Sequence, residues 1–280
     1  MQTLQNTFKC ILAAFIFFTR IPFWRIANVE KRYFERIIPF WPLVGWLTGG
    51  VMTMTILAAN SAGLSVGTGV MLALISRVLV TGALHEDGFA DFCDGFGGGT
   101  SRQRTLDIMK DSHIGTYGVL GLILYYMLIW NQLSVLFNMR LTPFMFIAAD
   151  AACKYISSQI TIFLPYARKE YEAKSRTIYA ESTAAGRIAG MFFGLLPITA
   201  LWCFLDTGFS YTTLLTLLFF PAAAAFILFS FMRRRIGGYT GDCCGATFII
   251  TETVFYFTLF LILKPCLLYT SPSPRDYAAS

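Results

Sequence analysis

The chain consists mainly of long apolar segments separated by short polar connections. About 20 apolar residues suffice to cross a membrane as a helix, because a helix rises about 1.5 Å per residue and the hydrocarbon core is about 30 Å thick. The pattern predicts eight helices, over residues 6–19, 38–59, 66–84, 117–137, 143–164, 188–205, 212–231 and 248–264. The first is short enough to lie at the membrane interface instead. We therefore predict an all-α polytopic integral membrane protein with about seven or eight transmembrane helices.

The apolar pattern stops near residue 265. The last segment, 266–280, alternates Ser and Pro residues and ends in an Arg-Asp pair and small residues. This composition does not continue an apolar helix, and it is compatible with a read-through or cloning scar. We predict one integral-membrane catalytic domain over residues 1–265 and a disordered tail over 266–280.

Positive charge alternates between the connections. Four connections contain most of the 22 Lys and Arg residues: 20–37, 85–116, 165–187 and 232–247. The turns between them, 60–65, 138–142 and 206–211, contain only one Lys or Arg residue, Arg140. Basic loops remain in the cytoplasm, so the four basic connections are predicted to lie there together.

Composition supports the membrane assignment and argues against a nucleic-acid-binding protein. Hydrophobic residues make up 56% of the chain and charged residues 14%, whereas soluble domains carry about 25% charged residues. The net charge of +6 does not indicate a nucleic-acid-binding protein, because the basic residues are spread over short loops rather than gathered on one face.

One acidic stretch, which includes residues 85–95, interrupts the apolar pattern and contains candidate metal ligands and a candidate catalytic base. Asp87, Asp91 and Asp94 stand at i, i+4 and i+7, which places them on one side of a helix. Like charges at this spacing repel, and a divalent cation relieves the repulsion. Oxygen ligands favour Mg²⁺, Mn²⁺ or Ca²⁺, so the three carboxylates are the predicted metal ligands. His85 and Glu86 are candidates for a catalytic base.

Glycines surround these acids. Gly88 and Gly95 lie between the acidic positions, and we expect them to let an anionic group approach the backbone.

Further polar residues are candidates for substrate binding. They are basic or acidic groups near glycine-rich turns or inside apolar segments: Lys110, Asp111, Lys154, Arg233, Arg234, Arg235 and Asp242. Three of these assignments have alternatives. Asp111 is also a candidate helix cap, Lys154 also pairs at i+4 with Asp150, and the three arginines also fit a topology signal.

Five segments together resemble one family. They are TRIP at 19–22, PLVG at 42–45, HEDGFADFCDG at 85–95, IMKDSHIGTYG at 108–118 and GYTGDCCGA at 238–246. In this order, from about residue 10 to 263, they are similar to the cobalamin synthase family, the adenosylcobinamide-GDP ribazoletransferases. The resemblance places His85, Asp87, Asp91, Asp94, Lys110, Asp111 and Asp242 at family motif positions and Glu252 at a family acid. His113 stands where the family usually has Arg.

The resemblance also implies an activity. It implies a bacterial inner-membrane enzyme that uses Mg²⁺ to join adenosylcobinamide-GDP to α-ribazole or its 5′-phosphate, with release of GMP. Its expected partners are these two substrates and membrane lipid, with no nucleic acid, and the oligomeric state stays open.

Two other functions compete with this one. A CDP-alcohol phosphotransferase-like enzyme also binds Mg²⁺ and a pyrophosphate on membrane helices, but its pattern has an Asp-Gly-x-x-Ala-Arg core, and the segment that starts at Asp87 here, Asp-Gly-Phe-Ala-Asp, lacks the Arg. A cation or solute transporter would also explain many helices and paired acids, although transporter sites lie near the middle of the membrane.

Overall fold

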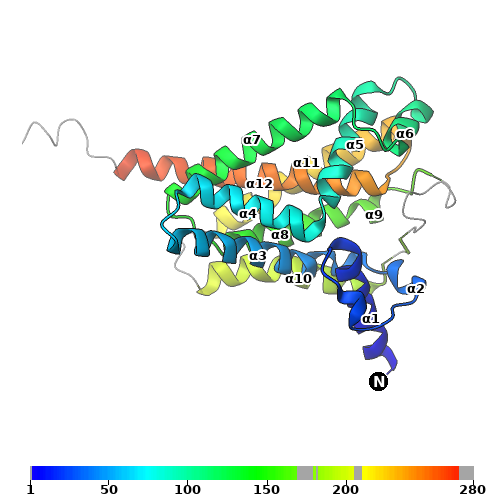
Figure 1. The fold of residues 1–280 in the computed structure, drawn as a ribbon, viewed down its shortest axis with the longest axis horizontal. Coiled ribbons are helices and arrows are strands. Elements are labelled where there is room, and N and C mark those ends of the chain that lie inside the picture. Colours follow the sequence, from blue (N-terminus) through cyan, green and yellow to red (C-terminus); the bar gives the residue numbers. More distant parts are fainter. Residues whose placement is uncertain (1, 169–178, 181, 205–209, 271–280) are drawn as a thin grey trace, which may run out of the picture.

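The computed structural model describes residues 2–168, 179–180, 182–204 and 210–270. These residues form helices and, outside them, one isolated β-bridge between Tyr166 and Tyr239. In chain order the helices are α1 (Gln2–Phe18), η1 (Phe23–Arg25), α2 (Lys31–Phe34), η2 (Ile38–Phe40), α3 (Trp41–Ser61), α4 (Val66–Thr81), α5 (Leu84–Gly98), α6 (Arg102–Lys110), α7 (Thr116–Asn138), α8 (Met145–Ser158), α9 (Ile160–Phe163), α10 (Ala184–Phe204), α11 (Tyr211–Ile236) and α12 (Gly241–Thr270). The long helices lie side by side as an elongated bundle (Figure 1).

The prediction of an all-α polytopic membrane protein is confirmed. Within the described residues five segments are long and apolar enough to span a membrane: Ile38–Ser61, Thr116–Asn138, Ala184–Phe204, Tyr211–Ile236 and Gly241–Lys264. The bent pair of α4 and α5 makes a sixth if it counts as one span. The predicted number of seven or eight is therefore not confirmed.

Two predicted spans account for the difference. The apolar part of α1, Gln5–Phe18, is too short to qualify as a span. Helix α8 has 14 residues, and twelve of them are buried among its neighbours. At the C-terminal end, α12 continues past residue 265 to Thr270, and residues 271–280 of the predicted tail lie outside the described residues.

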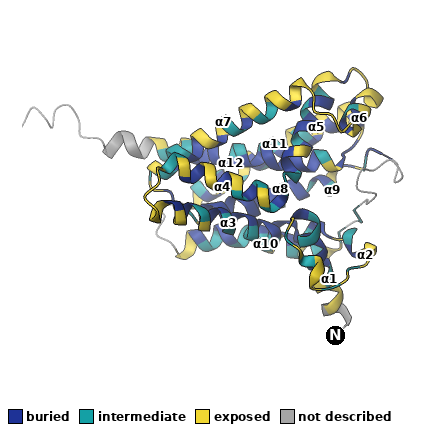
Figure 2. Ribbon diagram, viewed as in Figure 1, coloured by how far each residue is buried: buried dark blue, intermediate teal, exposed yellow. Residues whose placement is uncertain are grey.

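Burial shows which faces meet lipid. Helices α7, α10 and α11 carry exposed large apolar side chains, including Leu124, Phe192 and Ile227. Exposed positions follow one another along the outer side of α7 (Figure 2). Helices α8 and α12 are covered on most sides, and 56% of the apolar part of α12 is buried. An exposed apolar surface of this extent is expected where lipid replaces water as the solvent.

The acidic stretch becomes a helix because the chain turns sharply before it. Gly82 and Ala83 have left-handed backbone angles, with φ of 66° and 59°. Two consecutive residues in this conformation end α4 and start α5 at 90° to it. The acids predicted at helical spacing therefore do lie on a helix, and that helix is partly buried.

Close contact between α5 and α12 depends on two glycines. A Cβ atom on Gly88 would lie 3.0 Å from the Cα of Asp242, and one on Gly245 would lie 3.0 Å from the carbonyl oxygen of His85. The side chains of Asp87 and Asp242 are therefore brought to neighbouring positions on two helices far apart in sequence.

The basic connections gather at one end of the bundle. The α1–α3 and α5–α7 connections, the end of α9, the start of α10 and the α11–α12 turn lie at the right in Figure 1, and the α3–α4 and α7–α8 turns lie at the opposite end. The alternation predicted from charge is thus present in the fold. Which end faces the cytoplasm stays a prediction.

Charged side chains buried within the bundle join four helices. Arg77 of α4 forms an ion pair with Glu252 of α12 and donates a hydrogen bond to the hydroxyl of Tyr125 on α7 at 2.6 Å. Its guanidinium also lies 3.8 Å from Glu86 of α5. Because an unpaired buried charge costs several kcal/mol, these pairs hold α4, α5, α7 and α12 in one arrangement.

We expect Arg77→Met to lower the free energy of unfolding by about 3–5 kcal/mol, because Glu252 then keeps a charge without its main partner. Thermal unfolding in detergent measures the change. Arg140→Met, on an exposed turn at the other end of the bundle, is the matched control. The double variant Arg77→Met/Glu252→Gln should regain most of the loss, and a stable Arg77→Met protein would contradict the assignment.

Candidate active site

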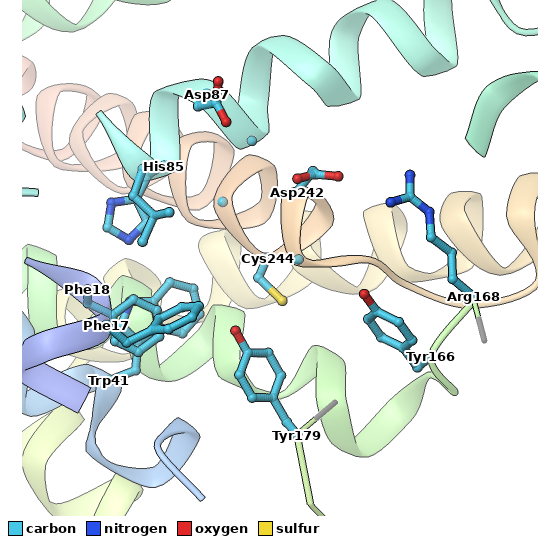
Figure 3. Close-up of a pocket in the computed structure, with 14 residues that line it drawn as sticks. Phe17, Phe18, Trp41, His85, Asp87, Tyr166, Arg168, Tyr179, Asp242 and Cys244 are labelled. Carbon is cyan, nitrogen blue, oxygen red and sulfur yellow. The ribbon is translucent and has the colours of Figure 1, made fainter. Parts of the chain in front are cut away.

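A cavity of about 330 Å³ opens between α1, α3, α5, the 165–168 segment and the start of α12. This volume is within the usual range for small-molecule sites. Its lining combines charged, aromatic and small residues: Phe17, Phe18, Trp41, Leu84, His85, Asp87, Gly88, Tyr166, Arg168, Tyr179, Gly241, Asp242, Cys244 and Gly245. The segments that line it lie at the end of the bundle where the basic connections meet (Figure 1), and Figure 3 shows the cavity in close-up.

One side of the cavity is charged. Asp87 is exposed on α5, and Asp242 stands in the first turn of α12. The guanidinium of Arg168 lies beyond Asp242 in the same view (Figure 3). Two carboxylates and a guanidinium on one cavity wall are groups that bind a cation and an anion side by side.

The 165–168 segment is pinned to the turn before α12. The backbone N–H of Ala167 donates to Tyr239 at 2.8 Å, and the N–H of Tyr239 donates to Pro165 at 3.0 Å. Arg168 donates to the carbonyl of Leu106 on α6 at 2.9 Å, which uses one of its five N–H donors. These bonds hold Arg168 beside Asp242.

Helix α6 is hydrogen-bonded to the 165–168 segment and to the end of α11. Arg102 donates to the carbonyls of Ile236 and Ala167, both at 2.8 Å.

Burial raises the pKa of the Tyr166 hydroxyl to about 12, so this group remains a hydrogen-bond donor at the cavity at neutral pH.

The opposite side of the cavity is aromatic. His85 is 2% exposed, and its ring is nearly parallel to those of Trp41 and Phe18, with interplanar angles of 13° and 6°. The Asp87 carboxylate lies away from this ring (Figure 3). Positions i and i+2 of a helix point to nearly opposite sides, so the two motif residues face different surroundings.

Glu86 faces the bundle interior. It is 4% exposed, and the Arg77 guanidinium lies 3.8 Å away. Of the two predicted bases, His85 therefore lines the cavity and Glu86 belongs to the buried ion pairs.

Asp94 is bound to the backbone at the start of α7. Its carboxylate accepts hydrogen bonds from the N–H groups of Gly115 at 2.7 Å and Gly118 at 2.8 Å. A Cβ on either glycine would collide with the carboxylate, so the approach requires glycine at both positions. Asp94 thus caps α7, although it is 24 residues away from the farther donor.

The three predicted metal ligands do not meet at one point. Asp87 faces the cavity, Asp91 is buried one turn further along α5, and Asp94 is engaged with α7. Among the described residues no group of three His, Cys, Asp or Glu side chains is arranged to hold a metal ion. A metal at this cavity would have to use fewer protein carboxylates.

The structure gives the two glycines different surroundings. Gly88 packs against Asp242 of α12 and also lines the cavity, whereas a Cβ on Gly95 would collide with Met109 of α6. Gly95 therefore serves helix packing, and the approach of an anion to the backbone stays a prediction for Gly88.

Lys110 and Asp111 lie outside the cavity lining and are exposed. Asp111 accepts a hydrogen bond from the backbone N–H of His113 at 3.0 Å and lies 2.7 Å from its ring. These contacts lower the pKa of the Asp111 carboxyl. The cap of α7 predicted for Asp111 is instead provided by Asp94.

Lys154 is completely buried and pairs with Asp150, with Thr48 bonded to both. The mutual ion pair, one of the two predicted alternatives, is therefore present, and Lys154 does not line the cavity.

The three arginines end α11 on its exposed side. Arg235 donates to the carbonyl of Gly99 at 2.7 Å, at the C-terminal end of α5. A cation there complements the negative end of the helix dipole. Arg233 and Arg234 are exposed and lie outside the cavity lining.

Sequence reasoning missed the aromatic residues and Arg168. Phe17, Phe18 and Trp41 are apolar residues among many, and Arg168 is one of several basic loop residues. No spacing signal in the sequence distinguishes them, because they meet only through the packing of α1, α3 and the 165–168 segment.

Comparisons with known proteins identify the family. The model of the cobalamin-5-phosphate synthase family matches residues 10–260. The chain belongs to this family. It is 35% identical over 254 residues to the adenosylcobinamide-GDP ribazoletransferase of Mesorhizobium japonicum, covering 90% of this chain and 91% of the relative. The enzyme of the same name from Leptospira interrogans is 32% identical, covering 91% of this chain and 96% of the relative. No solved structure matches.

The family match covers most of the helical domain and the cavity. The matched range contains every described residue that lines the cavity, from Phe17 to Gly245. The resemblance seen in the sequence motifs is therefore confirmed.

The cap formed by Asp94 allows a test independent of catalysis. We expect Asp94→Ala to lower the free energy of unfolding by about 1–2 kcal/mol even with a chelator present, because two backbone N–H groups lose their acceptor. Thermal unfolding of purified protein measures it. Asp87→Ala, on the exposed side of the same helix, should change stability little. Equal stability of both variants would show that Asp94 does not act as a cap.

Proposed function

We propose that the protein is an Mg²⁺-dependent adenosylcobinamide-GDP ribazoletransferase of the bacterial inner membrane. The observation that carries this proposal is the cavity, in which Asp87, Asp242 and Arg168 share one wall, in a chain of the cobalamin-5-phosphate synthase family. The names of the relatives supply the donor substrate and the ribazole acceptor.

The proposed reaction is a phosphoryl transfer. A hydroxyl oxygen of α-ribazole, or of its 5′-phosphate, attacks the phosphorus atom attached to cobinamide. A new P–O bond forms to the ribose, the anhydride P–O bond breaks, and GMP leaves with the bridging oxygen. The hydroxyl proton passes to a base, so no oxidant or reductant is needed.

The residues on the charged wall fit a magnesium ion shared with the substrate. Mg²⁺ is usually bound by one or two carboxylates together with substrate phosphates, and Asp87 and Asp242 provide two carboxylates on adjacent helices. When bound there, the ion would neutralise charge on the pyrophosphate oxygens. This assignment retains Asp87 from the predicted set and adds Asp242 to it.

Arg168 would bind a phosphate of the donor. Its guanidinium is buried beside Asp242, and its remaining donors suit the geometry of a phosphate. In a buried site this contact is stronger than at the surface, because less water screens it.

The proton acceptor belongs to the cavity lining. Asp87, Asp242 and His85 line the cavity, whereas Glu86 lies against Arg77 in the interior. We therefore propose that the base is one of these three cavity side chains.

We also propose that the cavity faces the cytoplasm. It lies at the end of the bundle where the basic connections meet, and basic loops remain on the cytoplasmic side. The donor carries phosphate and both substrates are polar, so an opening toward the cytoplasm gives them access.

The activity is tested with purified full-length protein in detergent. With adenosylcobinamide-GDP, α-ribazole 5′-phosphate and Mg²⁺, we expect release of GMP and formation of a cobamide 5′-phosphate, measured by liquid chromatography. A chelator should stop the reaction, and added Mg²⁺ should restore it. Absence of GMP release under all conditions would exclude the proposed activity, and release unaffected by the chelator would exclude the metal.

Asp87→Asn should lower kcat by about 100-fold or more, because the charged wall loses a carboxylate needed for charge stabilisation. Asp107→Asn, on the exposed side of α6, is the matched control and should retain normal kcat. Near-normal turnover of Asp87→Asn at saturating Mg²⁺ would remove Asp87 from the proposed metal site.

A further inference from the structure

Apart from His85, one of the three candidate bases, the aromatic side of the cavity has no role in the proposed phosphoryl transfer. We call this side the aromatic wall and define it by Phe17, Phe18, Trp41, His85 and Tyr179. Its residues come from α1, α3, α5 and the segment before α10. Aromatic rings from four separate elements thus line one side of the same cavity. Such a surface suits a ligand with an aromatic group.

Three rings of the wall share one orientation. Phe18 and Trp41 are inclined by 9° with centroids 5.2 Å apart, and Trp41 and His85 by 13° with centroids 5.8 Å apart. The rings of Phe17 and Tyr179 meet edge to face, at 83° and 6.4 Å, and both are half-buried. Parallel buried rings with half-buried rings beside them form a slot suited to a flat aromatic group.

The wall also carries ring nitrogen atoms without partners. Among the described residues, Trp41 Nε1 and both ring nitrogens of His85 are buried and make no hydrogen bond. His85 and Trp41 are 2% and 1% exposed, so a ligand reaches these atoms only when a ring of the wall shifts. A buried donor left unpaired is costly, so such a shift of Trp41 would be favoured by a ligand whose ring nitrogen accepts a hydrogen bond.

These observations select one of the substrate groups. We propose that the aromatic wall binds the benzimidazole base of the ribazole substrate, while Asp87, Asp242 and Arg168 hold the phosphates. The base is flat, apolar and bicyclic, and it has one unsubstituted ring nitrogen that accepts a hydrogen bond. This inference rests on the proposed function and assigns the specificity for the acceptor base to the wall.

The other two ring systems of the substrates fit less well. Guanine carries an amide and an amino group that each need partners, whereas the wall is mostly apolar and offers polar atoms only at Trp41, His85 and Tyr179. The corrin macrocycle is too large for a cavity of about 330 Å³ that also holds phosphates. Size and polarity therefore both favour the benzimidazole base.

The test uses full-length protein in detergent and measures KM for each substrate separately. Phe17→Leu and Tyr179→Leu remove a ring from half-buried positions, and Phe8→Leu, exposed on the same α1 helix, is the control. Stacking on one aromatic ring typically changes affinity by about 5- to 30-fold. We expect KM for α-ribazole 5′-phosphate to rise by this factor, while KM for adenosylcobinamide-GDP changes less than about 2-fold.

A binding experiment on the unaltered protein covers the case in which these variants fail to fold. Calorimetry with α-ribazole, which lacks phosphate, should detect binding that free 5,6-dimethylbenzimidazole competes for and guanosine does not. Guanosine competing equally well, or a raised KM for adenosylcobinamide-GDP in the variants, would overturn the assignment. So would an unchanged KM for both substrates in folded variants.

The outcomes separate this inference from the proposed function. Wild-type protein that releases GMP but shows no effect of the wall variants contradicts the inference alone. Wild-type protein that binds α-ribazole at the wall but releases no GMP contradicts the proposed function alone.

Discussion

The pairing of charges inside the bundle is the interaction on which the cavity depends. Arg77 joins α4 to α12 and α7 through Glu252 and Tyr125, and Lys154 pairs with Asp150 on α8. Both cations lie over the ring of Phe248, at 5.6 Å for Arg77 and 4.2 Å for Lys154. The same ring packs against His85 at 4.7 Å. The buried ion pairs and the aromatic wall therefore share the ring of Phe248.

Helix α5 distributes its acids among three environments, and this follows from helical geometry and from the helices around it. Glu86 faces α4, Asp87 faces the cavity, and Asp94 faces the start of α7. Repulsion among carboxylates on one helix is relieved when each has a different partner, and here a guanidinium and two backbone N–H groups already serve two of them. Asp87, at the end of the helix beside Asp242 of α12, is then the carboxylate available for the proposed cation.

The fold class could be predicted from regular patterns in the sequence. The site was harder to predict, because it depends on contacts between segments that are distant in the sequence. Apolar length and loop charge predicted helices with basic connections at one end, because both depend on composition over many residues. They did not reveal the 90° turn at Gly82 and Ala83, which depends on two backbone angles. The spacing of Asp87, Asp91 and Asp94 correctly indicated a helix, but spacing alone does not show that Asp94 reaches α7. No sequence pattern indicated that Arg168 belongs to the site, because its position beside Asp242 arises from the pairing of Tyr166 with Tyr239.

A membrane bundle suits this chemistry because it excludes water on most sides of the cavity. His85 and Trp41 are nearly inaccessible although they line the cavity, and Arg168 is 8% exposed. Interactions of Arg168 with phosphate are strengthened where solvent screening is low. In the proposed reaction an aromatic wall would exclude water from the acceptor side in the same way, which would protect a pyrophosphate donor from hydrolysis while the ribose hydroxyl is positioned. The proposed roles of the two walls thus complement each other, since the charged wall would bind the group that is transferred and the aromatic wall would keep water from competing with its acceptor.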